Sequence, residues 1–140
     1  MIEKDMDKTI TEHFKEYLSY PEVPIDDRRI DWIFLNEVSE IIAVELKIRN
    51  WKNVLRQAMS NRFCSNKSYA AIWYEYAKNI KLDWFEKSGI GLLLVFEDRV
   101  EEIIEPKSYL MDEITESMKI IRSNIEDKSD SGVCDNAKKN

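Results

Sequence analysis

The 140-residue chain has few of the residues on which several common kinds of site depend. It contains only three glycines, which excludes a glycine-rich phosphate-binding loop. His13 is its only histidine, so a histidine metal cluster is excluded, and no nucleophile motif accompanies it for a Ser-His-Asp triad. The two cysteines, Cys64 and Cys134, form no Cys-x-x-Cys pair. We expect both to be free thiols in a reducing compartment.

Long apolar runs are also missing from the chain. The longest, residues 90–96, is far too short to span a bilayer, so we expect a soluble, cytoplasmic protein. With 44% hydrophobic and 11% aromatic residues, the chain has enough apolar content for the core of one domain, which we predict over residues 1–125. Residues 126–140 are almost entirely polar and predict a disordered tail.

The net charge of −6 is distributed unevenly along the sequence. Residues 1–45 carry −7, whereas residues 46–74 carry +6, because no acid lies between Glu45 and Glu75. The basic residues of this stretch are Lys47, Arg49, Lys52, Arg56, Arg62 and Lys67. Such a cluster indicates either contact with an anionic partner such as DNA or a solvated helix face.

Hydrophobic spacing predicts an α/β protein, a mixed sheet flanked by helices, with elements in the order α-β-β-α-β-α-β-β-α. The expected helices cover residues 5–19, 51–63, 76–88 and 108–125. The expected strands cover residues 29–35, 41–48, 68–75, 90–96 and 100–105. Gly89 is expected to end the third helix, and the apolar strand 90–96 is expected inside the sheet.

The first two expected strands form a hairpin that brings charged residues together. If its turn centres on Val38, Asp31 lies opposite Glu45, with their Cβ atoms about 5 Å apart. Opposed like charges are destabilising, so a divalent cation between the two carboxylates is the simplest explanation for them. Lys47 follows on the same face as Glu45, because strand side chains alternate with period two. An ordinary ion pair on a solvated strand is the alternative interpretation.

The motif resembles the core signature of the PD-(D/E)XK nuclease superfamily, which has the restriction-endonuclease-like fold. Its parts are Asp31, a 13-residue spacer, Glu45-Leu46-Lys47 in an apolar strand, and a following helix that carries Gln57. The resemblance covers roughly residues 5–105. It implies that Asp31, Glu45 and the Leu46 carbonyl bind Mg²⁺, with Mn²⁺ as a substitute, and that Lys47 assists the attacking water.

The resemblance also implies a glutamate from the first helix, for which Glu12 is the first choice and Glu16 the second. Two positions depart from the family pattern. Ile30 replaces the proline that usually precedes the aspartate, and Asn61 stands where the RecB-like branch has a tyrosine. The branch is therefore unassigned, and Gln57 fits an ordinary polar helix residue as well as a site residue.

These expectations describe a divalent-metal-dependent nuclease that hydrolyses DNA phosphodiester bonds through a metal-bound water. The candidate catalytic residues are Asp31, Glu45, Lys47, Glu12 and Gln57. The candidate DNA contacts are Arg28, Arg29, Arg49, Lys52 and Arg56. The aromatic residues Trp51, Trp73, Tyr74, Tyr76 and Trp84 are expected mainly in the core, with base stacking as the alternative.

Two other functions fit the same sequence. The first is a catalytically inactive restriction-like fold that serves as a nucleic-acid-binding or protein-interaction module. The second is an interaction protein whose net negative charge faces a basic partner. Because a lone domain of this size covers little DNA, we also expect a homodimer.

Overall fold

The computed structural model describes residues 3–109 and 119–125 of the chain. The elements are α1 (Glu3–His13), β1 (Leu18–Ile25), β2 (Arg28–Leu35), β3 (Ile41–Lys47), α2 (Trp51–Asn61), η1 (Arg62–Cys64), β4 (Lys67–Trp73), η2 (Tyr74–Tyr76), α3 (Leu82–Ser88), β5 (Gly91–Val95) and β6 (Val100–Ile104). Residues 119–125 are also helical. Most of the expected last helix and the expected tail, residues 110–118 and 126–140, lie outside the described residues.

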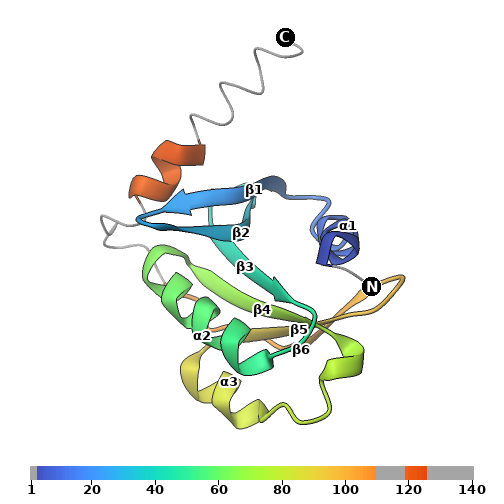
Figure 1. The fold of residues 1–140 in the computed structure, drawn as a ribbon. Helices are drawn as coiled ribbons and strands as arrows, with labels where there is room; N and C mark the ends of the chain where they lie inside the picture. The colour runs from blue at the N-terminus through green and yellow to red at the C-terminus, as the bar shows by residue number, and fades with distance from the viewer. Residues whose placement is uncertain (1–2, 110–118, 126–140) are drawn as a thin grey trace.

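The six strands of the described residues form one sheet in the order β1-β2-β3-β4-β5-β6. The central pairs β3–β4 and β4–β5 are parallel, while the pairs β1–β2, β2–β3 and β5–β6 are antiparallel. Figure 1 shows α1 on one side of this sheet and α2 and α3 on the other. The predicted mixed sheet flanked by helices is therefore confirmed, and so is the inner position of β5.

The hairpin of β2 and β3 has the predicted register. Trp32 pairs with Val44 and Ile33 with Ala43, which is the pairing that a turn centred near Val38 requires. Asn36 organises the turn, because its side-chain oxygen accepts hydrogen bonds from the backbone of Val38 and Glu40.

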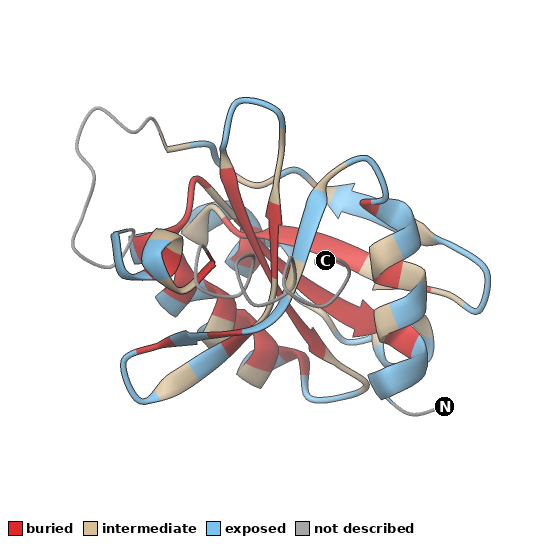
Figure 2. Cartoon of the chain, turned by 90° about the horizontal axis from the view of Figure 1, so that it is seen from above, coloured by how far each residue is buried: buried red, intermediate tan, exposed pale blue. Residues whose placement is uncertain are grey.

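Each face of the sheet carries its own apolar packing. Val44 and Leu46 of β3 pack with Met6, Ile10 and Phe14 of α1 and the turn after it. On the other face, Ala70 and Ile72 of β4 pack with α2 and α3. In the view of Figure 2, the buried residues concentrate in the central strands and on the inner sides of the helices. Glu45 alternates with Val44 and Leu46, so it points toward the α2 face.

The N-terminal region differs from the expectation. The predicted helix over residues 5–19 ends at His13, and residues 18–25 form a strand that the sequence did not predict. Pro21 and Pro24 disfavour the interior of a sheet, but β1 is an edge strand whose only neighbour among the described residues is β2. A missing N–H is tolerated there because half of the backbone groups face no other strand.

The region after β4 is also less helical than predicted. The strand ends at Trp73, one short turn of 3₁₀ helix covers Tyr74–Tyr76, and α3 begins only at Leu82. Gly89 ends α3 with a φ of 74°, as predicted for a left-handed position.

Among the described residues, no helix is long and apolar enough to cross a membrane.

Candidate active site

The candidate site lies where β2 and β3 separate. The last paired residues at this end of the hairpin are Trp32 and Val44. Beyond them, the backbone N–H of Leu46 donates a hydrogen bond of 2.9 Å to Oδ2 of Asp31. A side-chain carboxylate thus replaces the strand carbonyl that would otherwise accept this bond, and the aspartate is fixed at the opening between the strands.

Glu45 is the most deeply buried acid of the site, with 3% of its surface exposed. Nδ2 of Asn61 donates a hydrogen bond of 2.9 Å to its Oε2. Nη1 of Arg28 in turn donates a bond of 2.7 Å to Oδ1 of Asn61. These contacts connect β2, α2 and β3, so Arg28, expected as a DNA contact, is engaged inside the protein.

Burial and mutual repulsion dominate the electrostatics of the two acids. Burial and, after it, the nearby charge of Asp31 raise the pKa of Glu45 to about 8, although the hydrogen bond from Asn61 lowers it. Burial also raises the pKa of Asp31, while the Leu46 N–H and the charge of Lys47 lower it. In the absence of a cation, the pair therefore retains a proton at neutral pH.

The donors present fit a magnesium ion. A buried pair of carboxylates that holds a proton at neutral pH releases it readily when a cation takes its place. Mg²⁺ is often bound through one or two carboxylates and completed by water. Among the described residues no group of three or more His, Cys, Asp or Glu side chains is arranged to hold a metal ion, so a site here would rest on Asp31 and Glu45 with the Leu46 carbonyl.

Carboxylates from α1 and β1 approach Asp31 from the other side. A pocket of about 280 Å³ is lined by Glu3, Asp7, Pro21, Glu22, Asp31, Trp32 and Leu46. Asp7 accepts a hydrogen bond of 2.8 Å from Nε1 of Trp32, and its charge contributes to the raised pKa of Asp31. Glu22 has a positive φ of 47° and interrupts the ladder beside Asp31.

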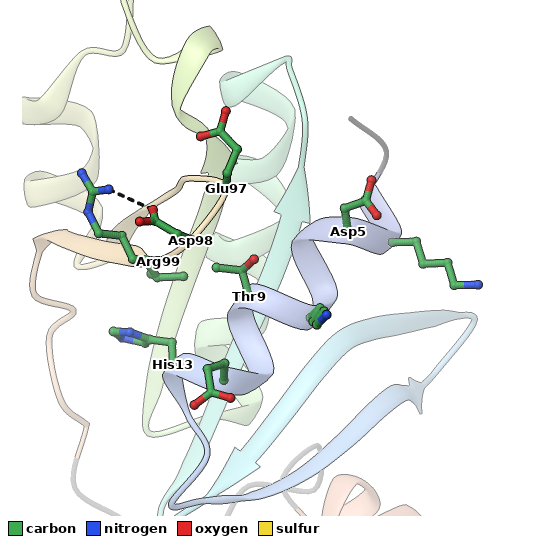
Figure 3. A pocket seen from close by; sticks show the side chains of 10 residues that line it. Asp5, Thr9, His13, Glu97, Asp98 and Arg99 are labelled. Carbon is green, nitrogen blue, oxygen red and sulfur yellow. Dashed lines mark hydrogen bonds and ion pairs between the residues drawn. The ribbon is translucent and has the colours of Figure 1, made fainter.

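The structure does not bring the predicted helix glutamates into this group. Glu12 lines a separate pocket of about 740 Å³ between α1 and the turn that follows β5 (Figure 3). Its carboxylate pairs with Lys15 at 3.3 Å, and 72% of its side-chain surface is exposed. Glu16 follows the end of α1 and is exposed. The α1 acid beside Asp31 is therefore Asp7, with Glu3 lining the same pocket.

Lys47 lies close to Asp31, and Gln57 lies on the helix that carries Asn61. Lys47 is half-buried at the end of β3, and its charge acts on Asp31. Gln57 precedes Asn61 by four residues, so both lie on one side of α2. Its Oε1 atom is buried without a hydrogen-bond partner in the described part of the chain.

The basic residues of the sequence divide into two groups. Arg49, Lys52 and Arg56 are exposed at and after the start of α2, and Arg29 is exposed on β2. Arg62 and Lys67 are half-buried: Lys67 lies 3.7 Å from Glu40, and Arg62 stacks over the ring of Tyr109. The exposed group remains the candidate DNA contact.

Two residues of the site were not predicted from the sequence. Asn61 stood out only as a departure from the family's tyrosine, although its spacing of four from Gln57 placed it on the same side of the helix. Asp7 lies three residues before the buried Ile10, a spacing that predicts a position beside the apolar stripe of α1. Glu12 has no such relationship to that stripe.

No family model and no curated protein matches the sequence. Among solved structures, the SPO1766 protein of unknown function from Silicibacter pomeroyi has a TM-score of 0.70 at 15% identity, over 92% of this chain and 86% of that chain. EndoMS in its complex with dsDNA has a TM-score of 0.52 at 16% identity, over 69% and 45% of the two chains. A repair endonuclease from Pyrococcus abyssi has a TM-score of 0.46 at 19% identity, over 70% and 47%.

These similarities concern the fold. The chain spans less than half the length of the EndoMS and Pyrococcus abyssi chains. The restriction-endonuclease-like fold class that the sequence predicts is confirmed by the six-stranded mixed sheet and its flanking helices.

Proposed function

We propose that the protein is a divalent-metal-dependent nuclease that hydrolyses DNA phosphodiester bonds. The observation that carries this proposal is the meeting of Asp31 with the buried Glu45 where β2 and β3 separate. Asp31 lines a pocket and Glu45 is buried behind it, and two interacting acids with raised pKa values are a candidate for catalysis rather than for stability. The fold of EndoMS, solved with dsDNA, is consistent with such a role.

Each residue has a specific task in this proposal. Asp31 and Glu45, with the Leu46 carbonyl, would hold the ion, and the Leu46 N–H and Asn61 would fix the orientation of the two carboxylates. A bound ion would supply Lewis-acid activation of the phosphate and a lowered pKa of water. Lys47, beside the acids, would orient the attacking water and balance charge as the bond breaks.

A test uses supercoiled plasmid and a labelled linear duplex with Mg²⁺, Mn²⁺, Ca²⁺ or EDTA. We expect cleavage with Mg²⁺ and Mn²⁺, and loss of cleavage in Asp31→Asn and Glu45→Gln, whose side chains keep nearly the parent shape. Glu12→Gln serves as the matched control and should cleave like the parent. An Asp31→Asn protein as active as the parent would contradict the proposal.

Nicked or linearised plasmid would indicate an endonuclease. Light scattering would test the expected homodimer.

One observation favours the second candidate, an inactive binding module. Among the described residues no group of three or more acids is arranged to hold a metal ion, and the raised pKa of Glu45 favours a proton on the pair when no cation is bound. Calorimetry with Mn²⁺ distinguishes the two functions. Absence of heat from the parent protein, together with retained DNA binding, would favour the module.

A further inference from the structure

An exposed group of aromatic and basic side chains lies beside the candidate active site. It consists of Arg49, Lys52, Tyr76, Lys81 and Trp84, which we call the aromatic–basic surface. Arg49 follows Lys47 by two residues, so their Cα atoms are at most about 7 Å apart. Tyr76 follows β4, whose Ile72 pairs with Lys47 in the parallel ladder. The carboxyl ends of both strands therefore open toward this surface, which is where ligands bind in many sheets of this kind.

The aromatic side chains of this surface are fixed but accessible. Trp84 and Tyr76 each have 42% of their surface exposed. The ring of Trp84 packs edge-on against the buried Trp51, with 5.3 Å between ring centroids. Arg49 lies 4.8 Å from the centroid of Tyr76 and donates a hydrogen bond of 3.2 Å to its hydroxyl. These contacts hold the rings in place without covering them.

The cations of the surface are positioned over the same rings. Nζ of Lys52 lies 5.6 Å from the Trp84 ring centroid, and Nζ of Lys81 lies 5.7 Å from it. The neighbouring acids are engaged elsewhere: Asp83 pairs with Lys87 at 3.6 Å, and Glu75 accepts a hydrogen bond of 2.8 Å from Trp73. Asp83 is balanced by Lys87, and the three cations Arg49, Lys52 and Lys81 outnumber Glu75, so the surface is positively charged and aromatic in a protein whose net charge is −6.

We propose that the aromatic–basic surface binds unpaired nucleotides of single-stranded DNA, and this inference rests on the nuclease function proposed above. Aromatic faces flanked by cations are the arrangement by which proteins bind single strands: bases stack on the rings, and the cations contact phosphates. Stacking of a base on an aromatic ring is stronger than an exposed cation–π contact, so a base displaces the lysines from Trp84. The freed ammonium groups then reach the backbone.

The position of the surface also favours single-stranded DNA as its ligand. A duplex presents its phosphates outward and hides the faces of its bases, so the rings of Tyr76 and Trp84 would contribute little to its binding. A strand that leaves the site unpaired would expose its bases directly to them. The preferred substrate would accordingly be a single strand, a flap or a frayed end, with the scissile phosphate near Lys47.

The test measures binding in EDTA, where cleavage cannot occur, by fluorescence anisotropy with a labelled oligothymidine strand and with a labelled duplex of equal length. We expect the parent to bind the single strand more tightly than the duplex. Trp84→Ala and Tyr76→Ala should each weaken single-strand binding about tenfold, the scale of losing one stacked base. Trp84→Phe should retain most of the affinity because a ring remains. Phe63→Ala, which removes an aromatic side chain that is 74% exposed on η1, should bind like the parent.

Quenching of tryptophan fluorescence by unlabelled oligothymidine gives a second measurement, which Trp84→Phe should reduce. The inference is overturned by equal affinity for single strand and duplex, by parent-like binding in both alanine variants, or by no binding of the single strand. None of these results bears on cleavage of duplex plasmid with Mg²⁺, which tests the proposed function separately. Conversely, a protein that binds single strands through Trp84 but cleaves no DNA would support this inference and contradict the proposed nuclease function.

Discussion

Asn61 on α2 donates a hydrogen bond of 2.9 Å to the buried carboxylate of Glu45 on β3, while its own side-chain oxygen accepts one of 2.7 Å from Arg28. One amide therefore joins a cation to a buried acid. The bond lowers the pKa of Glu45 against the effect of burial. Asn61 is thus placed to set both the orientation and the ionisation of the candidate metal ligand.

We therefore expect Asn61→Ala to lower the free energy of unfolding by about 1–3 kcal/mol, the cost of leaving buried polar groups without partners. The same change should raise the pKa of Glu45 and move the pH dependence of cleavage to higher pH. Urea denaturation and a cleavage pH profile measure the two effects. Asn53→Ala on the same helix is the control. A loss of stability with an unchanged pH profile would mean that Asn61 has only a structural role.

The ionisation of Glu45 should make stability depend on pH in metal-free buffer. Its pKa is about 8 in the folded protein and near the ordinary 4.5 in the unfolded chain. Below pH 4.5 both states are protonated at this group, so its contribution to stability is fully present. As the pH rises from 4.5 toward 8, only the unfolded chain releases the proton, and stability falls by up to about 1.4 kcal/mol per pH unit.

Urea denaturation of the parent and of Glu45→Gln, both in EDTA, measures this dependence. The difference in unfolding free energy, parent minus variant, should decrease between about pH 4.5 and 8, because glutamine does not titrate. Taking the difference cancels the slopes of the acids that do not interact with Glu45. A difference that stays constant over this range would contradict the raised pKa.

The sequence predicted the parts of the fold that depend on neighbours in the chain. The register that brings Asp31 to Glu45 follows from the turn between two strands, and the start of α2 follows from the apolar spacing after Trp51. β1 could not be predicted in this way. Pro21 and Pro24 disfavour a strand locally, and only the position at the sheet edge makes them acceptable.

The site residues that were predicted also depend on neighbours in the chain, whereas those that were missed depend on the packing of distant elements. Glu45 and Lys47 belong to one strand, so their proximity follows from period two. Asn61 and Asp7 reach the acids only through the packing of α2 and α1 on opposite faces of the sheet. The angle and depth of a packed helix are set by many side chains at once, and a single sequence does not specify them.

The position of Asp7, rather than the predicted Glu12, beside Asp31 has a direct test. Asp7→Asn keeps an oxygen that can accept the bond from Trp32 but removes the charge that raises the pKa of Asp31. If Asp7 takes part in the site, we expect this change to alter cleavage about tenfold or more, on the scale of a group that positions a proton or an ion. Glu12→Gln, whose side chain is largely exposed, should change cleavage less than twofold. Equal effects of both substitutions would exclude a special role for Asp7.

Lys47 provides the sharpest distinction between a catalytic and a structural interpretation. A half-buried lysine that merely balanced the charge of Asp31 would contribute little to function, whereas one that orients the attacking water acts mainly in the transition state. We expect Lys47→Ala to bind Mn²⁺ and DNA within a few-fold of the parent but to lose cleavage about a hundredfold or more. Lys67→Ala, on the neighbouring strand, is the matched control. Single-turnover cleavage in Mg²⁺ beside a DNA titration in Ca²⁺ gives both quantities, and equal losses in the two would assign Lys47 to binding or folding rather than to catalysis.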